Sequence, residues 1–187
     1  MPIRIYIDQG HNPESPNSGA EGNGYREQDL VYTIGVALFE RLSTDPNFEP
    51  RLSRPTPETS LGSSNASSLR VRVNAANAWP ADLFLSLHTN ASVDASATGT
   101  ESLVYRLKSK SAEIGTVISR NIAQRTGLRN RGVKARPGLY VLRRTNMPAV
   151  LVELGFITNP ADAALMASSP NLFADAIYSA LRTYYGV

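Results

Sequence analysis

The stretch IRIYIDQGH, residues 3–11, decides the fold that we expect. It starts as an apolar run of strand length and ends abruptly in a polar turn that carries Gly10 and His11. A second run, LFLSLHTN at residues 83–90, also leads directly into a histidine, His88. The chain has only two histidines, and both lie at the ends of expected buried strands.

Strand-length apolar runs alternate with segments of helical period along the whole chain. This alternation predicts an α/β fold with a twisted, mostly parallel sheet of about six strands and helices on both faces. At 187 residues, without an internal repeat, the chain is expected to be a single domain over residues 1–187. The expected strands are Ile3 to Ile7, Arg51 to Ser53, Leu83 to Leu87, Glu101 to Arg106, Tyr140 to Leu142 and Ala149 to Leu154.

Four apolar stripes at helical spacing predict helices that pack on this sheet. One follows Glu27, and another is expected to end at Gly127 as a C-terminal cap. The remaining segments, rich in Gly, Pro, Ser and Asn, are interpreted as loops. The stripes are Leu30 to Leu42, Leu69 to Ala76, Ile114 to Ile122 and Leu172 to Tyr184, and the loops are 12–26, 46–67, 89–100 and 129–138.

Composition excludes several classes of protein. There is no cysteine, which rules out disulfides, thiolate nucleophiles, zinc fingers and iron–sulfur clusters. No apolar run approaches the roughly 18 residues that span a bilayer, and the first residues lack the apolar stretch of a signal peptide. We therefore expect a soluble chain without membrane insertion, whose metal ligands, if any, are His, Asp, Glu or backbone oxygen.

The net charge of +3 is modest but unevenly placed. No acidic residue lies between Glu113 and Glu153, and this interval predicts a positive face. The face is either a set of solvated side chains or a surface for an anionic ligand or polymer. Its basic residues are Arg120, Arg125, Arg129, Arg131, Lys134, Arg136, Arg143 and Arg144.

The two histidines favour a metal site over two unrelated structural histidines. Ligands of open α/β sheets bind outside the carboxyl ends of the strands, and His11 and His88 are both expected at that edge. Two imidazoles suit zinc, and a catalytic zinc site commonly adds one carboxylate. Glu14, Glu21 and Glu27 are candidates, and Glu27 is preferred because it opens a helix that can aim it rigidly. Its alternative role is that of a favourable anion at a helix N-terminus.

Glu153 is the second carboxylate of interest. It lies within PAVLVELGFITNP, residues 148–160, which we interpret as a fully buried strand. An ionised carboxylate there costs several kcal/mol unless a partner stabilises it. The partner is either one of the arginines or a water at the metal, and in the second case Glu153 is a general base.

These motifs, in this order, make the chain resemble the zinc-dependent N-acetylmuramoyl-L-alanine amidases of the Amidase_3 family. The resemblance covers almost the whole chain and includes IYIDQGHNPESPNSGA from Ile5, GYREQD from Gly24, SLHTNA from Ser86 and VELGFITN from Val152. The first loop departs from the family, since many relatives have a Gly-rich HGG followed by Asp where this chain has HNPESPNSGA. Substrate contacts around residues 12–18 are therefore expected to differ.

The resemblance implies a function and a site. It implies a peptidoglycan hydrolase that cleaves the amide between N-acetylmuramic acid and L-alanine of the stem peptide, at the cell wall. The chain is expected to be a monomer. One Zn²⁺ per chain is implied on His11, Glu27 and His88, with Glu153 as the catalytic base. Asn90, Arg72 and Arg131 are expected to contact substrate or to brace the site, with Arg72 pairing with a nearby carboxylate.

Two other classes of function remain open from the sequence. One is a zinc carboxypeptidase-like metallohydrolase, which shares the metal and the glutamate but releases amino acids. The other is a non-catalytic module that binds the wall or a nucleic acid through the basic face. The four residues of the implied site argue against a silent module, and nucleic-acid binding is not expected.

Overall fold

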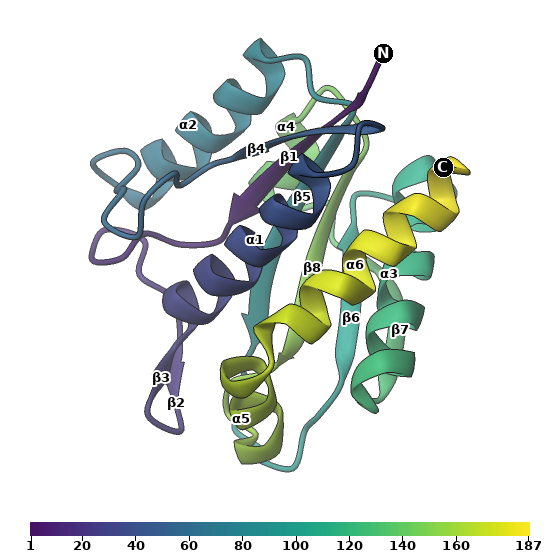
Figure 1. The fold of residues 1–187 in the computed structure, drawn as a ribbon. Helices are drawn as coiled ribbons and strands as arrows, with labels where there is room; N and C mark the ends of the chain where they lie inside the picture. The colour runs from purple at the N-terminus through teal and green to yellow at the C-terminus, as the bar shows by residue number, and fades with distance from the viewer.

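The centre of the molecule is a six-stranded sheet, which the computed structural model shows together with all of residues 1–187. Its strands are β1 (Ile3–Gln9), β4 (Phe48–Leu52), β5 (Leu83–Asn90), β6 (Thr100–Val104), β7 (Asn130–Ala135) and β8 (Ala149–Phe156). The strand order is β4-β1-β5-β8-β6-β7, and only the β6–β8 pair is antiparallel (Figure 1). The expected mostly parallel sheet of about six strands is thus confirmed.

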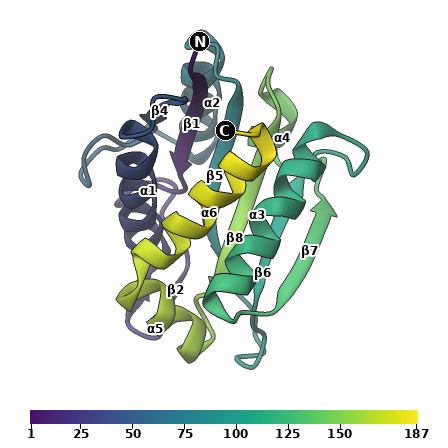
Figure 2. The ribbon, with the colours of Figure 1, turned by 45° about the vertical axis from the view of Figure 1, so that its right-hand side comes forward.

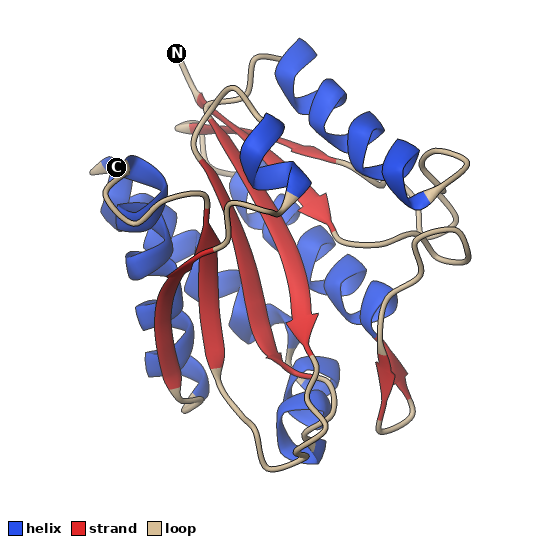
Figure 3. Ribbon diagram, turned by 180° about the vertical axis from the view of Figure 1, so that it is seen from behind, coloured by secondary structure: helices blue, strands red, loops and turns tan.

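Helices cover both faces of the sheet, as the sequence predicted. Figure 2 shows α1, α6 and α3 side by side on one face, and Figure 3 shows α2 and α4 on the other. No helix has both the length and the apolar character needed to cross a membrane. The helices are α1 (Glu27–Ser43), α2 (Asn65–Ala78), α3 (Lys110–Thr126), α4 (Tyr140–Arg144), α5 (Pro160–Ser168) and α6 (Pro170–Tyr185).

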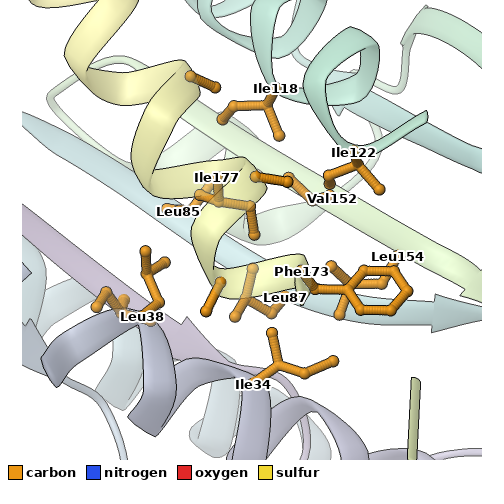
Figure 4. Packing of buried hydrophobic residues seen from close by; sticks show 14 of the residues in the cluster. Ile34, Leu38, Leu85, Leu87, Ile118, Ile122, Val152, Leu154, Phe173 and Ile177 are labelled. Atoms are coloured by element: carbon orange, nitrogen blue, oxygen red, sulfur yellow. The ribbon is translucent and has the colours of Figure 1, made fainter. Parts of the chain in front are cut away.

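The core divides between the two faces because strand side chains alternate with a period of two. The larger cluster has 28 buried residues and lies under α1, α3 and α6. Figure 4 shows Leu85 and Val152 of the sheet beside Phe173 and Ile177 of α6. The smaller cluster has 10 buried residues and joins α2 and α4 to the opposite face, which carries Phe84.

Two predicted segments were wrong. Tyr140 to Leu142, predicted as a strand, is the first turn of α4, because Val141 and Leu142 pack as a short helix on the smaller core. Residues 130–135, predicted as loop, form β7, an edge strand whose pairing shifts register near Gly132, at a φ of 76°. Its basic residues and this irregularity concealed the strand pattern.

The structure contains some elements that were not predicted, and it confirms the remaining predicted helices. The short hairpin of β2 (Glu21–Gly22) and β3 (Tyr25–Arg26) lies in the expected first loop, and α5 was not predicted. The other four helices form where the apolar stripes indicated. Gly127 ends α3 at a φ of 76°, so the predicted cap is confirmed.

The smaller-core face leaves part of the sheet without a helix. In Figure 3, α2 and α4 lie over one end of this face, and no helix lies over the other end of β5, β8 and β6. His88, two residues beyond Ser86 on β5, and Glu153, two beyond Leu151 on β8, point to this face by the strand period. The uncovered end of the sheet is therefore where both predicted residues lie.

Candidate metal centre and active site

Three predicted metal ligands converge, although they are far apart in the sequence. His11 follows β1, Glu27 opens α1 and His88 lies in β5. Glu27 Oε1 lies 3.2 Å from His11 Nε2 and 3.0 Å from His88 Nδ1. One donor atom from each residue fits within a group no wider than 4.8 Å. The structure therefore brings the three together as a possible His-Glu-His metal site.

The backbone holds Glu27 rigidly at this point. Its own N–H donates to the Ala20 carbonyl, and its Oε2 accepts from the Ala20 N–H at 2.9 Å. Its Oε1 accepts from the Thr89 N–H at 2.9 Å, so the same carboxylate joins the first loop to the end of β5. Only 4% of the Glu27 side chain is exposed. A buried carboxylate with this many fixed donors is preorganised rather than free to rotate.

Two glycines allow the ligands to approach one another. A Cβ on Gly10 would lie 2.5 Å from His88 Cε1 and 2.6 Å from His88 Nε2. A Cβ on Gly19 would lie 2.8 Å from Glu27 Cβ and 3.0 Å from His11 Cδ2. Any other residue at either position would displace a ligand side chain.

His11 has a left-handed backbone conformation, with a φ of 66°. A non-glycine residue adopts it only when its surroundings hold it there. The Arg72 guanidinium supplies that hold by donating to the His11 carbonyl through Nη2. The same guanidinium donates to Asp8 Oδ1 and to the Gln9 carbonyl, each at 2.7 Å.

Arg72 pairs with a carboxylate near the site, and that carboxylate is Asp8. Only 1% of Arg72 is exposed, and its donors also reach Ser53, Ser68 and Asn12. Direct contact with substrate, one of the roles expected for Arg72, does not fit this burial. Arg72 instead positions the backbone that presents His11.

Glu153 lies beside the three ligands on the neighbouring strand. It pairs with His88 across the β5–β8 ladder, and its Oε2 is buried without a hydrogen-bond partner. No arginine or lysine forms an ion pair with it, so the expected alternative of a structural salt bridge is not observed. Burial raises the pKa of Glu153 to about 7; His88 opposes this rise, and the carboxylates of Glu27 and Glu101 reinforce it.

The ligands influence one another's ionisation. Burial alone would raise the pKa of Glu27, but hydrogen bonds and charges from His11 and His88 hold it well below its usual range. Burial alone would lower the pKa of His88, and the Glu27 carboxylate raises it above its usual range. The cluster therefore carries a stable anion at its centre, as a cation-binding site requires.

The remaining predicted residues are placed around this cluster. Glu14 and Glu21 are exposed, and Glu14 forms an ion pair with Arg26 at 2.9 Å, away from the histidines. Asn90 donates to Glu101 Oε1 at 3.3 Å, and Arg131 Nε lies 3.4 Å from Glu101 Oε2. Asn90 and Arg131 thus adjoin the site through a carboxylate that the sequence did not single out.

Sequence reasoning missed Glu101 as a site residue and did not single out Lys134 within the basic stretch. Glu101 is 4% exposed, is the direct partner of Glu153 across the antiparallel β6–β8 ladder, and forms an ion pair with Lys134. The available signal was a glutamate at the start of the predicted strand Glu101 to Arg106. The neighbouring strand β7 had been interpreted as loop, so no partner for Glu101 was apparent.

The donor set fits zinc. Two imidazole nitrogens and one carboxylate oxygen are the ligands of many catalytic zinc sites. The close approach at Gly10 and Gly19 and the buried, unpartnered Glu153 Oε2 are both accounted for if a cation and a water complete the cluster.

Comparison with known proteins agrees with this arrangement. The family model described as N-acetylmuramoyl-L-alanine amidase matches residues 5–183. The chain is 35% identical to the uncharacterized protein YqiI of Bacillus subtilis over 185 residues, covering 97% of this chain and 84% of YqiI. It is also 35% identical to the N-acetylmuramoyl-L-alanine amidase LytC of Bacillus subtilis, covering 97% of this chain but 35% of LytC.

The fold is shared with solved amidases. The N-acetylmuramoyl-L-alanine amidase from Clostridium difficile 630 superposes with a TM-score of 0.87 at 29% identity, covering 99% of this chain and 97% of that one. The family match spans every element that contributes to the cluster of His11, Glu27, His88 and Glu153. The chain therefore belongs to the N-acetylmuramoyl-L-alanine amidase family.

Proposed function

We propose that this chain hydrolyses peptidoglycan at the amide between the lactyl group of N-acetylmuramic acid and L-alanine of the stem peptide. Family membership supports the reaction class, and the cluster at the uncovered end of the sheet supports its location. His11, Glu27 and His88 would hold one zinc ion. When bound, zinc supplies Lewis acidity, which lowers the pKa of water and polarises a carbonyl.

Glu153 is the general base in this proposal. Its carboxylate accepts a proton from the attacking water as the oxygen of that water bonds to the lactyl carbonyl carbon. Glu153 then gives this proton to the nitrogen of L-alanine as the C–N bond breaks. The products are a free lactyl carboxylic acid and a stem peptide with a free amino group, so one water is consumed for each bond cleaved.

The single observation that carries this role is the unpartnered Glu153 Oε2. A buried carboxylate oxygen without a donor is rare in folded proteins, because its desolvation is not compensated. Here it lies opposite a candidate ligand, His88, and no basic side chain neutralises it. A pKa raised toward neutrality lets one carboxyl group both accept and release a proton near pH 7.

Product analysis tests the reaction. Purified protein loaded with one equivalent of zinc is incubated with purified peptidoglycan, and the soluble fragments are identified by mass spectrometry. Stem peptides that begin with free L-alanine, together with unsubstituted glycan, are expected. Release of single amino acids from peptide C-termini would instead identify a carboxypeptidase, and intact peptidoglycan would leave only a binding role.

The substrate also gives the expected location and partners. Peptidoglycan lies outside the cytoplasmic membrane, so the protein is expected to act at the cell wall. We expect a monomer, because the whole site is formed by one chain. Its expected binding partners are peptidoglycan and muropeptides, and nucleic-acid binding is not expected.

A further inference from the structure

Four ionisable residues form a row across adjacent strands of the uncovered sheet face. His88 pairs with Glu153 across β5–β8, and Glu153 pairs with Glu101 across β8–β6. Lys134 comes from β7, the next strand, and its Nζ donates to Glu101 Oε2. The row therefore runs from the proposed metal site to the basic edge strand.

The edge end of this row carries more positive than negative charge. Lys134 and Arg131 share the single carboxylate of Glu101. Arg131 is also held by its Nη1, which donates to the Thr98 carbonyl at 3.2 Å, and by the Phe156 ring at 5.0 Å. The Lys134 side chain is 36% exposed and its Nζ makes one hydrogen bond, which leaves donors free for a ligand.

The other side of the two histidines is different. Arg72, the one arginine or lysine that lines the cavity on this side, is 1% exposed and already has six protein acceptors. This cavity is small, about 130 Å³, and its lining includes Leu69, Leu139 and Tyr140. A neutral group suits this cavity, whereas Lys134 over β6 and β7 keeps donors free for a substrate anion.

We propose that Lys134 and Arg131, held in place by Glu101, form a subsite for the α-carboxylate of the second stem-peptide residue. The inference rests on the proposed function, in which the scissile amide lies beside Glu153. The sugar of the substrate is neutral at its lactyl amide, whereas the peptide carries carboxylates. The peptide therefore lies over β6 and β7, and a γ-linked D-glutamate at its second position presents a free α-carboxylate.

The dimensions agree with this position. Adjacent strands are about 4.8 Å apart, so β6 and β7 lie about 5 Å and 10 Å from Glu153 across the sheet. Each peptide residue spans at most about 3.6 Å, which places a carboxylate on the second residue about 7 Å from the scissile bond. The Lys134 ammonium reaches back from β7 to the Glu101 carboxylate and so lies within this range.

Two synthetic substrates test the subsite. Both are N-acetylmuramoyl tripeptides with an amidated C-terminus, and they differ only in whether the second residue is γ-linked D-glutamate or its α-carboxamide. We expect the zinc-loaded wild type to have a kcat/KM at least about tenfold higher for the acid, because a charge-assisted hydrogen bond is lost in the amide. Lys134→Met should bring the ratio close to one by lowering kcat/KM for the acid alone.

Two variants serve as controls. Lys134→Arg keeps the charge and should retain the preference for the acid. Lys108→Met removes one exposed lysine that forms no ion pair, and should leave both rates unchanged. A wild type that cleaves both substrates equally, or a Lys134→Met variant that loses both rates in proportion, overturns the subsite while leaving the amidase function intact.

Binding separates this inference from the proposed reaction. Calorimetry with the zinc-loaded Glu153→Gln variant measures the affinity for each substrate without turnover. A preference for the acid that disappears in the Glu153→Gln, Lys134→Met double variant supports the subsite even if the wild type cleaves neither substrate. Equal affinity for acid and amide, or no binding of either, overturns it.

Discussion

His88 and Glu153 are direct partners across the parallel β5–β8 pairing and lie on the same face of the sheet. This pairing fixes the proposed base beside a proposed ligand through the register of two buried strands. Both residues lie in strands of the sheet and not in a loop. Strand positions are rigid, so they can hold catalytic groups within the narrow geometry that proton transfer requires.

The first prediction concerns Glu153→Gln. The amide retains the size of the side chain but cannot accept the proton of the attacking water, so turnover of peptidoglycan should fall by about 10²- to 10⁴-fold. Zinc content should stay near one equivalent by elemental analysis, because Glu153 is not a proposed ligand. Glu49→Gln, an exposed glutamate at the far edge of the sheet on β4, is the matched control and should retain full activity.

An active Glu153→Gln variant would remove Glu153 from the mechanism. A variant that is inactive but also lacks zinc would show that Glu153 supports the metal site rather than the proton transfer. The two readouts, turnover and zinc content, therefore separate the assigned role from a structural one.

The second prediction separates the candidate carboxylate ligands. Glu27→Ala and His88→Ala should each lose zinc, because each removes one of three converging donors. Glu14→Ala removes an exposed glutamate paired with Arg26 and should keep one equivalent. Elemental analysis after dialysis gives the metal content, and circular dichroism shows whether each variant is folded.

Zinc should also raise the thermal unfolding temperature of the wild type. A ligand that binds only the folded state stabilises it by about 2.7 kcal/mol at 100 times its Kd. The folded His88→Ala variant should show no such rise. Zinc content equal to wild type in either ligand variant contradicts the assignment of that residue.

The sequence predicted much of this site, because its residues occupy strands and helices with strong apolar patterns. The runs that end at His11 and His88 and the stripe after Glu27 are long enough to fix an element, its direction and its buried face. Buried parallel strands bring their carboxyl ends to one edge, so the convergence of His11 and His88 followed from the fold.

The features that were missed depend on tertiary contacts rather than on local pattern. β7 contains two basic residues, Arg131 and Lys134, and Gly132 interrupts its pairing, so only its ladder with β6 defines it as a strand. Lys134 and Glu101 meet because of that ladder. Arg72 was expected to pair with a nearby carboxylate, but a helix pattern does not show that this partner is Asp8 or that the guanidinium is buried.

The third prediction concerns the buried pair of Arg72 and Asp8. Arg72→Met leaves the Asp8 carboxylate buried without its cation, and removing one partner of a buried ion pair costs about 3–5 kcal/mol of folding free energy. The His11 carbonyl also loses its donor, so zinc affinity should fall with stability. Urea unfolding of the metal-free proteins measures the first effect, and zinc titration of the folded variant measures the second.

The same pair predicts how stability depends on pH. Burial alone would raise the pKa of Asp8, but the charge and hydrogen bond of Arg72, with the Ser86 hydroxyl, lower it below its usual range. A lowered folded-state pKa gives stability that is present above the unfolded value of about 3.9 and is lost as the pH falls through the folded value. The unfolding free energy of the metal-free protein should therefore fall more steeply below about pH 4 in wild type than in Asp8→Asn. Parallel profiles for the two proteins would contradict this coupling.

The last prediction uses Gly10, where the first strand passes beside His88. In Gly10→Ala, the new methyl group would lie 2.5 Å from His88 Cε1 and 2.7 Å from the Leu87 carbonyl oxygen, so the imidazole or the end of β1 must move. Forcing an extra methyl group into such a packed contact lowers the free energy of unfolding by about 1–3 kcal/mol. Because one of the displaced groups is a proposed ligand, zinc affinity and turnover should both fall.

Gly138→Ala is the matched control for this substitution. A Cβ at Gly138 has no heavy atom within 4 Å, and its backbone is not in the left-handed region. It should retain wild-type stability, zinc affinity and activity. If Gly10→Ala instead loses stability but binds zinc as tightly as the control in a competition titration, the close approach serves packing alone, and the His88 ring is not held in place by the glycine.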